Sequence, residues 1–114
     1  YRVLCGRNNL QNDELTMKLA ERDDWWFHVK DAPGSHVVLF TEGKGEPDSA
    51  DFTEAATIAA VNSSLPENAT AEVDYTLRRY IKKPSGSKPG FVIYTKNWSA
   101  LVQADAALAR KLKK

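Results

Sequence analysis

The sequence predicts a single α+β domain, residues 1–114, in which helices near residues 9–21 and 48–65 pack against a mostly antiparallel sheet. Short segments of alternating apolar and polar residues recur along the chain, which is typical of strands. Two longer segments carry apolar residues at helical spacing. With 42% hydrophobic and 27% charged residues, the chain has the composition of a globular domain with one core.

The first strand is expected over residues 1–5, and the first helix follows it. Asn8 or Asn9 can cap this helix, because a side-chain amide oxygen accepts a backbone N–H of the first turn. Leu15 and Leu19 lie one turn apart and should form its apolar face. The segment therefore has both a start signal and a buried side.

Residues 25–30 and 36–41 predict two strands joined by a turn at Pro33-Gly34. One face of the first strand carries Trp25, Phe27 and Val29, and the other carries Trp26, His28 and Lys30. The first set is wholly apolar, so it should face the core.

The second helix should begin at Asp48 or Ser49 and end before Pro66, with a face of small alanines that allows close packing on the sheet. We expect both helices on one face of that sheet. Further strands are expected over residues 71–82 and 91–95, separated by a basic loop. The domain core is placed at residues 4–95, and residues 96–114 are expected to form a divergent basic tail, helical from Leu101.

Charge is divided unevenly along the chain. Residues 1–74 contain six basic and fourteen acidic side chains, whereas residues 75–114 contain ten basic and one acidic. This division predicts a polarised surface whose basic part would attract phosphate. The alternative is that antiparallel pairing mixes the two parts.

Several classes of protein are disfavoured by the composition. No apolar run reaches the roughly 18 residues of a membrane span, so no membrane partner is expected. The single Cys5 cannot form an internal disulfide, and no signal-peptide pattern is present, which favours the cytoplasm. The chain begins without Met, which indicates an excised domain.

The two histidines, His28 and His36, flank the turn, and antiparallel pairing would bring them close. With Lys30 they could form an acid–base set, because a histidine near its unperturbed pKa exchanges protons at neutral pH. Alternatively they hydrogen-bond the turn or contact RNA, and these readings are favoured over catalysis. No third ligand has convincing spacing, so neither a metal nor another cofactor is expected.

Trp26 lies beside cations on the face opposite Trp25, where it could stack on a nucleic-acid base. The alternative is that the second helix covers this face.

Arg7 stands with Asn8 and Asn9 at a helix N-terminus, which either attracts an anion or is simply capped.

A basic loop is a further candidate site for binding RNA. Its small residues are surrounded by five cations and no acid: Arg78, Arg79, Lys82, Lys83 and Lys88. Backbone amides and hydroxyls between lysines can cradle phosphates. The alternative is a solvated hairpin tip.

Three blocks occur in order: GRNNLQND (6–13), WFHVKDAPGSHVVL (26–39) and VDYTLRRYIKKPSGSKPGFVIY (73–94). Together they resemble the NFACT-R domain, an RNA-binding module of ribosome-associated quality-control proteins. The resemblance implies a domain without catalysis of its own that contacts tRNA or the RNA of the large ribosomal subunit, within a longer protein. The resemblance marks functional positions, some of which should contact RNA while others hold the turn: Arg7, Asn8, Asn9, Trp26, His28, Lys30, Asp31, Ser35, His36 and the residues from Lys82 to Lys88.

Two other functions stay open. One is an RNA-processing enzyme centred on His28 and His36. The other is a protein-interaction module whose acidic segment, residues 42–54, docks a basic ribosomal protein.

Overall fold

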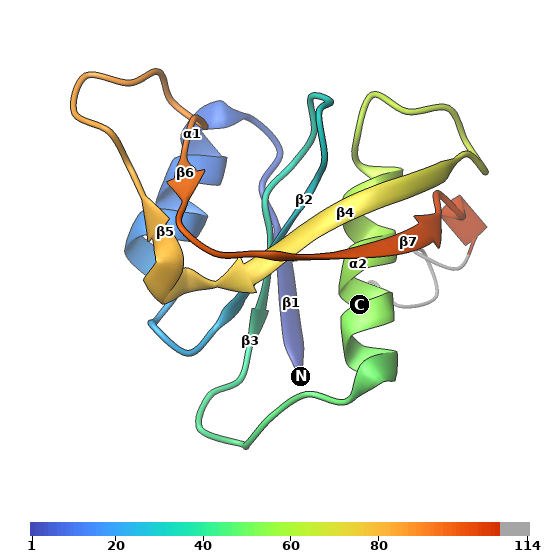
Figure 1. Cartoon of the computed structure of the whole chain (residues 1–114), viewed down its shortest axis with the longest axis horizontal. Helices are drawn as coiled ribbons and strands as arrows, with labels where there is room; N and C mark the ends of the chain where they lie inside the picture. Colours follow the sequence, from blue (N-terminus) through green and yellow to red (C-terminus); the bar gives the residue numbers. More distant parts are fainter. Residues whose placement is uncertain (108–114) are drawn as a thin grey trace.

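The computed structural model of the chain describes residues 1–107 and has a five-stranded antiparallel sheet at its centre, in the order β1-β3-β2-β4-β7 (Figure 1). Its strands are β1 (Arg2–Cys5), β2 (Trp25–Val29), β3 (Val37–Phe40), β4 (Thr70–Leu77) and β7 (Trp98–Gln103). A separate two-stranded ribbon pairs β5 (Ile81–Lys82) with β6 (Ile93–Tyr94). The predicted α+β class is confirmed.

The helices predicted near residues 9–21 and 48–65 are confirmed: they are α1 (Asn9–Asp13), the π-helix η1 (Glu14–Leu19) that continues it, and α2 (Ser49–Val61). A 3-10 turn, η2 (Arg78–Tyr80), interrupts the strand that was expected over residues 71–82. Asn8 caps α1 through a 2.9 Å bond from Gln11 N, and Asp48 and Asp51 form a capping box at α2. Within residues 1–107, no helix is long and apolar enough to cross a membrane.

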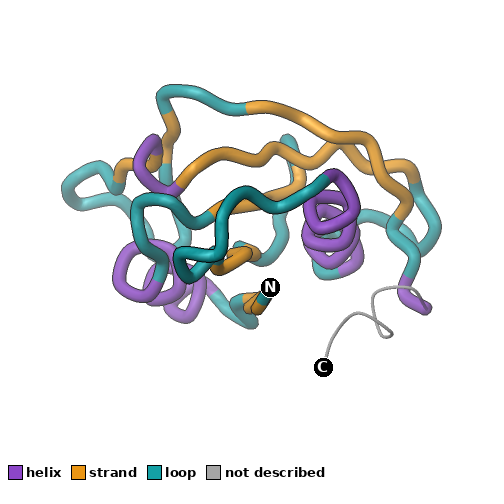
Figure 2. The backbone as a smooth tube through the Cα atoms, turned by 90° about the horizontal axis from the view of Figure 1, so that it is seen from below, coloured by secondary structure: helices purple, strands orange, loops and turns teal. Residues whose placement is uncertain are grey.

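The two helical segments lie on opposite faces of the sheet, so the expectation that both pack on one face is wrong. In Figure 2 they stand on either side of the N-terminal strand. One apolar cluster joins α2 to Trp25, Phe27 and Val29, whereas a second joins η1 to Trp26 and Val38. Successive residues of β2 and β3 point to opposite faces, so a helix on each side buries both sets.

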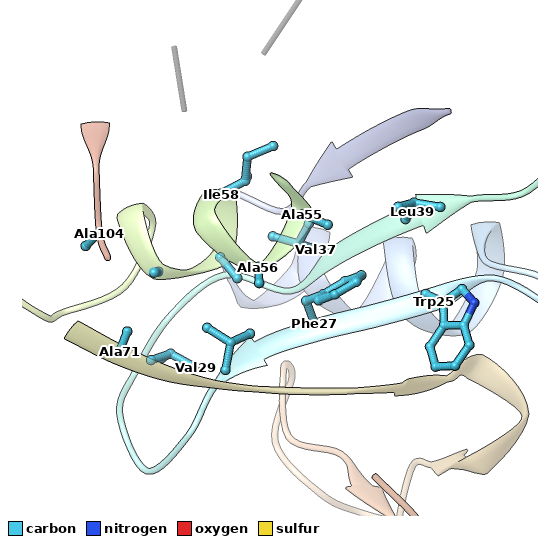
Figure 3. Packing of buried hydrophobic residues seen from close by; sticks show 13 residues of the cluster. Trp25, Phe27, Val29, Val37, Leu39, Ala55, Ala56, Ile58, Ala71 and Ala104 are labelled. Carbon is cyan, nitrogen blue, oxygen red and sulfur yellow. The ribbon is translucent and has the colours of Figure 1, made fainter. Parts of the chain in front are cut away.

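The larger core lies between α2 and the sheet. Its helix residues are small: Ala55, Ala56, Ala59 and Ala60 are buried. Figure 3 shows Ala55 and Ala56 beside Phe27 and Val37. Because alanine adds little volume, the helix approaches the strands closely, as the sequence predicted.

The helix expected from Leu101 is wrong for residues 101–103, which belong to the edge strand β7, whereas residues 106–107 are helical. Strand β7 pairs with β4 from Tyr75↔Trp98 to Thr70↔Gln103. Val102 packs against the α2 side of the core, and Leu101 on the alternate face is exposed. This two-residue alternation favours a strand. The basic end of the predicted tail lies outside the described residues.

Candidate functional site

A polar cleft of about 540 Å³ lies where the second and third sequence blocks meet. It is lined by side chains from β2, from the turn after β2 and from residues 90–97, including His28, Lys30, Asp31, His36, Tyr94 and Asn97. The segment after the turn is held against the end of α2, because Ser35 N donates to Asn62 O at 3.0 Å. The cleft therefore has a fixed wall.

His36 is a buried junction between the three blocks. Its Nε2 bonds the carbonyl oxygen of Gly90 at 3.0 Å, and its Nδ1 bonds Thr16 Oγ1 at 2.8 Å. A carbonyl can only accept, so Nε2 carries the proton and Nδ1 accepts from the Thr16 hydroxyl. Its backbone N–H donates to Asn12 Oδ1 at 3.1 Å.

The His36 ring is therefore fully used by internal contacts. Burial, with a smaller contribution from the nearby His28, lowers the pKa of His36 to about 4. The imidazole is neutral at pH 7, and both of its nitrogen atoms are engaged. This environment suits a structural histidine and leaves no free nitrogen for proton transfer to a substrate.

His28 lies next to His36, as the predicted pairing required, with ring centroids 5.6 Å apart. Its ring stacks on Trp26, with centroids 5.8 Å apart and an interplanar angle of 10°. Burial lowers the pKa of His28, while hydrogen bonds to the Val29 and Gly34 backbone and the charge of Asp74 oppose the shift. His28 is only partly buried and lines the cleft.

Trp26 is 2% exposed, so the expectation of an exposed stacking surface on this residue is wrong. Its indole packs with Leu15 of η1, Phe40 of β3 and Ile81 of β5. The first helical segment and the β5–β6 ribbon cover this part of the sheet, rather than the second helix as the alternative had it. The buried Trp26 ring therefore supports the stacked ring of His28.

The floor of the cleft contains a buried carboxylate that the sequence analysis had not selected. Asp74 is 5% exposed and accepts hydrogen bonds from Tyr94 Oη at 2.6 Å and Ser99 Oγ at 2.8 Å. Burial and the adjacent Asp74 raise the pKa of Tyr94. The sequence did contain a signal for this carboxylate, because Asp74 is an acidic residue in the middle of an alternating strand.

The basic loop lies beside α1 (Figure 1), and Lys83 fastens it to Asp13, the last residue of that helix. Lys83 Nζ lies 3.3 Å from Asp13 Oδ1 and also bonds the carbonyl oxygens of Lys88 and Phe91. Gly90 N donates to the same Asp13 oxygen at 2.8 Å. Lys83 therefore shapes the loop and is not a free cation.

Two more of the five predicted cations have structural partners. Arg78 Nε donates to Thr16 O at 2.5 Å, and its Nη1 donates to Ile81 O at 3.2 Å. Arg79 forms an ion pair with Asp23. By contrast, Lys82 and Lys88 are exposed and have no ion-pair partner within residues 1–107.

The first block mainly supports this surface. Asn8 caps α1, and the exposed Asn9 lies beside Gly90, where a Cβ atom would come within 2.8 Å of Asn9 Oδ1. Arg7 is exposed, and its backbone N–H donates to Gln11 Oε1. At the cleft rim, Lys30 faces Glu72 with 3.7 Å between Nζ and Oε2, an exposed pair of little strength.

A second, larger hollow of about 940 Å³ shares no lining residue with the polar cleft. It is lined in part by Glu21, Asp23, Glu42 and Glu46, so part of the acidic segment faces it. Among residues 1–107, no cluster of three or more His, Cys, Asp or Glu side chains is arranged to hold a metal ion.

The fold and this surface define a small α+β binding domain with a basic loop beside a polar cleft. Residues 1–95 match the NFACT protein RNA binding domain, and the chain belongs to that family. The resemblance drawn from the three blocks is confirmed.

Similar proteins extend the match across nearly the whole chain. The chain is 49% identical over 112 residues to the Rqc2 homolog RqcH of Bacillus subtilis and 43% identical to that of Streptococcus pneumoniae; both alignments cover 98% of the chain. It spans 19% and 20% of the length of these curated relatives. The solved C-terminal part of the fibronectin/fibrinogen-binding protein from Streptococcus suis has a TM-score of 0.90 at 39% identity, covering 98% of this chain and 44% of that one.

Proposed function

We propose that this domain contacts tRNA or ribosomal RNA in ribosome-associated quality control, as part of a longer protein in the cytoplasm. The observation that carries the proposal is the pair of free lysines: Lys82 at the end of β5, and Lys88 in the following loop, which Lys83 and Gly90 hold in place. Lysines without carboxylate partners bind phosphate with little competition, and a fixed loop loses little entropy on binding.

The polar cleft supplies the second part of the proposed interface. Phosphate contacts position an RNA, while groups that reach base edges or ribose hydroxyls discriminate between RNAs. Lys30, Asp31 and Asn97 are exposed at the cleft rim and offer donors and acceptors of this kind. His28, which is partly buried, lines the same cleft.

Fluorescence anisotropy with labelled tRNA over a salt series tests the phosphate contacts. The double variant Lys82→Gln/Lys88→Gln should weaken binding and reduce the slope of log K against log salt by about 1.4 to 1.8, the value for two phosphate contacts. The matched control, Lys18→Gln/Lys44→Gln, removes the same charge from exposed positions elsewhere and should leave the slope nearly unchanged. Equal losses in both variants would contradict the proposal.

The same proposal assigns no RNA-processing activity to the domain. His36 has no free ring nitrogen, which argues against a histidine pair that shares acid and base roles. Incubating RNA with the unchanged domain and with His36→Ala should leave the RNA intact in both cases. Cleavage that requires His36 would revive the enzymatic alternative.

A further inference from the structure

Strand β7 is one edge of the sheet (Figure 1), and its first residue belongs to an exposed aromatic surface. Trp98 is 39% exposed, and its ring centroid lies 5.8 Å from that of Trp25 and 6.2 Å from that of Tyr75. Trp25 contacts Phe52 of α2 edge to face. The exposed indole is therefore the outer member of an aromatic group whose inner members are fixed by the core.

Lys96 places its ammonium group over this surface. Its Nζ lies 5.0 Å from the ring centroid of Trp98 and 5.8 Å from that of Tyr80. Within residues 1–107, no carboxylate forms an ion pair with Lys96. An exposed aromatic ring and an unneutralised cation thus occur together.

The backbone around Lys96 is held by buried groups. Thr76, a fully buried residue of β4, donates its hydroxyl to Lys96 O at 2.6 Å, and Thr95 N donates to Tyr80 O at 3.0 Å. The backbone positions of Lys96 and Trp98 are therefore set by the sheet, while the Lys96 side chain is exposed.

We propose that Trp98, Lys96 and Tyr80 form a second contact surface for single-stranded RNA. A base stacks on Trp98 and displaces the Lys96 ammonium group, which then contacts an adjacent phosphate. Stacking on an aromatic side chain is stronger than an exposed cation–π contact, so the exchange is favourable. The inference rests on the proposed RNA-binding function and adds a site to it.

This surface adjoins the polar cleft without belonging to it. None of its three residues lines the cleft, but Asn97, between Lys96 and Trp98, does. Trp98 packs against Trp25 on the α2 face of the sheet, whereas the cleft lies on the opposite face with Trp26, so an RNA strand that contacts both sites passes around the β7 edge near Asn97. The competing explanation is that Lys96 and Trp98 only shield the aromatic group from water.

Binding of a fluorescein-labelled ten-nucleotide oligouridine to the full chain, followed by anisotropy over a salt series, separates these explanations. Trp98→Leu should weaken binding about tenfold, as expected for removing one stacked base. Lys96→Gln should reduce the salt slope by about 0.7, the value for one phosphate on a single strand. Leu101→Ala on the same strand and Lys44→Gln in the acidic loop are matched controls and should change neither quantity.

Trp98→Phe provides a second test if Trp98→Leu does not fold, because phenylalanine keeps most of the packing and reduces the stacking area. It should weaken binding about threefold, between the unchanged chain and the leucine variant. Unchanged binding by Trp98→Phe and Lys96→Gln, together with weaker binding by Lys82→Gln/Lys88→Gln, would overturn this inference and leave the proposed function standing. Absence of RNA binding by the unchanged chain would overturn both.

Discussion

Removing the imidazole of His36 should destabilise the domain strongly. His36→Ala breaks the ring bonds to Thr16 Oγ1 at 2.8 Å and to Gly90 O at 3.0 Å. Each such bond contributes about 1 kcal/mol, and leaving the two partners and a cavity in the interior adds about 1 to 2 kcal/mol. The free energy of unfolding should fall by about 3 to 4 kcal/mol, a large part of the 5 to 15 kcal/mol typical of a domain.

Urea unfolding followed by tryptophan fluorescence measures this loss. With an m-value of about 1.5 kcal/mol/M, the midpoint should fall by about 2 to 2.7 M. His28→Ala is a matched control, because His28 is an adjacent histidine that is only partly buried; we expect about half the effect. A loss below about 1 kcal/mol in His36→Ala, or one no larger than in His28→Ala, would refute the role of His36 as a structural junction.

Three further predictions follow from the same contacts. The pKa of His36 is about 4 in the folded protein and 6.5 in the unfolded chain, so the unfolded state binds more protons between these two pH values. The free energy of unfolding should therefore be highest above pH 6.5 and fall by about 3 kcal/mol as the pH drops to 4. Urea unfolding at each pH measures this loss. Gly90→Ala should cost about 2 kcal/mol and Gly86→Ala about 1 kcal/mol in thermal unfolding, since both residues have φ above +70° but only Gly90 lies against Asn9. Tyr94→Phe should lower the urea-unfolding free energy by about 2 kcal/mol, because it removes a hydrogen bond to the buried Asp74.

Each of these predictions has a contrary outcome. A His36→Gln variant with the same pH profile as the unchanged chain would assign the titration to another group. Equal stability of the two glycine variants would show that the Asn9 contact adds nothing. A neutral Tyr94→Phe would mean that Ser99 alone satisfies Asp74.

The local pattern of the sequence was sufficient for much of the fold. Alternation in β2 placed Trp25, Phe27 and Val29 in the core, and the cap residues fixed the starts of α1 and α2. The same alternation could not show what covers the opposite face. The π-helix η1 also changes the helical repeat, so Leu15 is buried while Leu19 is 52% exposed, although ordinary spacing placed them on one face.

The site was predicted less completely, because a cation's sequence position does not reveal its partners. Lys83 and Arg78 look like Lys82 and Lys88 in the sequence, yet they bond Asp13 and Thr16, residues more than sixty positions away. The alanine-rich tail likewise favoured a helix from Leu101, although the alternation of strand β7 continues to Gln103.

The junction at His36 has a consequence for how the domain is made during translation. His36 bonds Gly90 across 54 positions, and Gly90 bonds Asp13 across 77. Closing such long loops is slow and entropically costly, so these contacts should form late. A nascent chain can pair β1 with β3 and β2 with β3 early, but its basic loop cannot take its place until residue 90 has left the ribosome. The basic loop and the polar cleft beside it are therefore completed only after most of the domain has been synthesised.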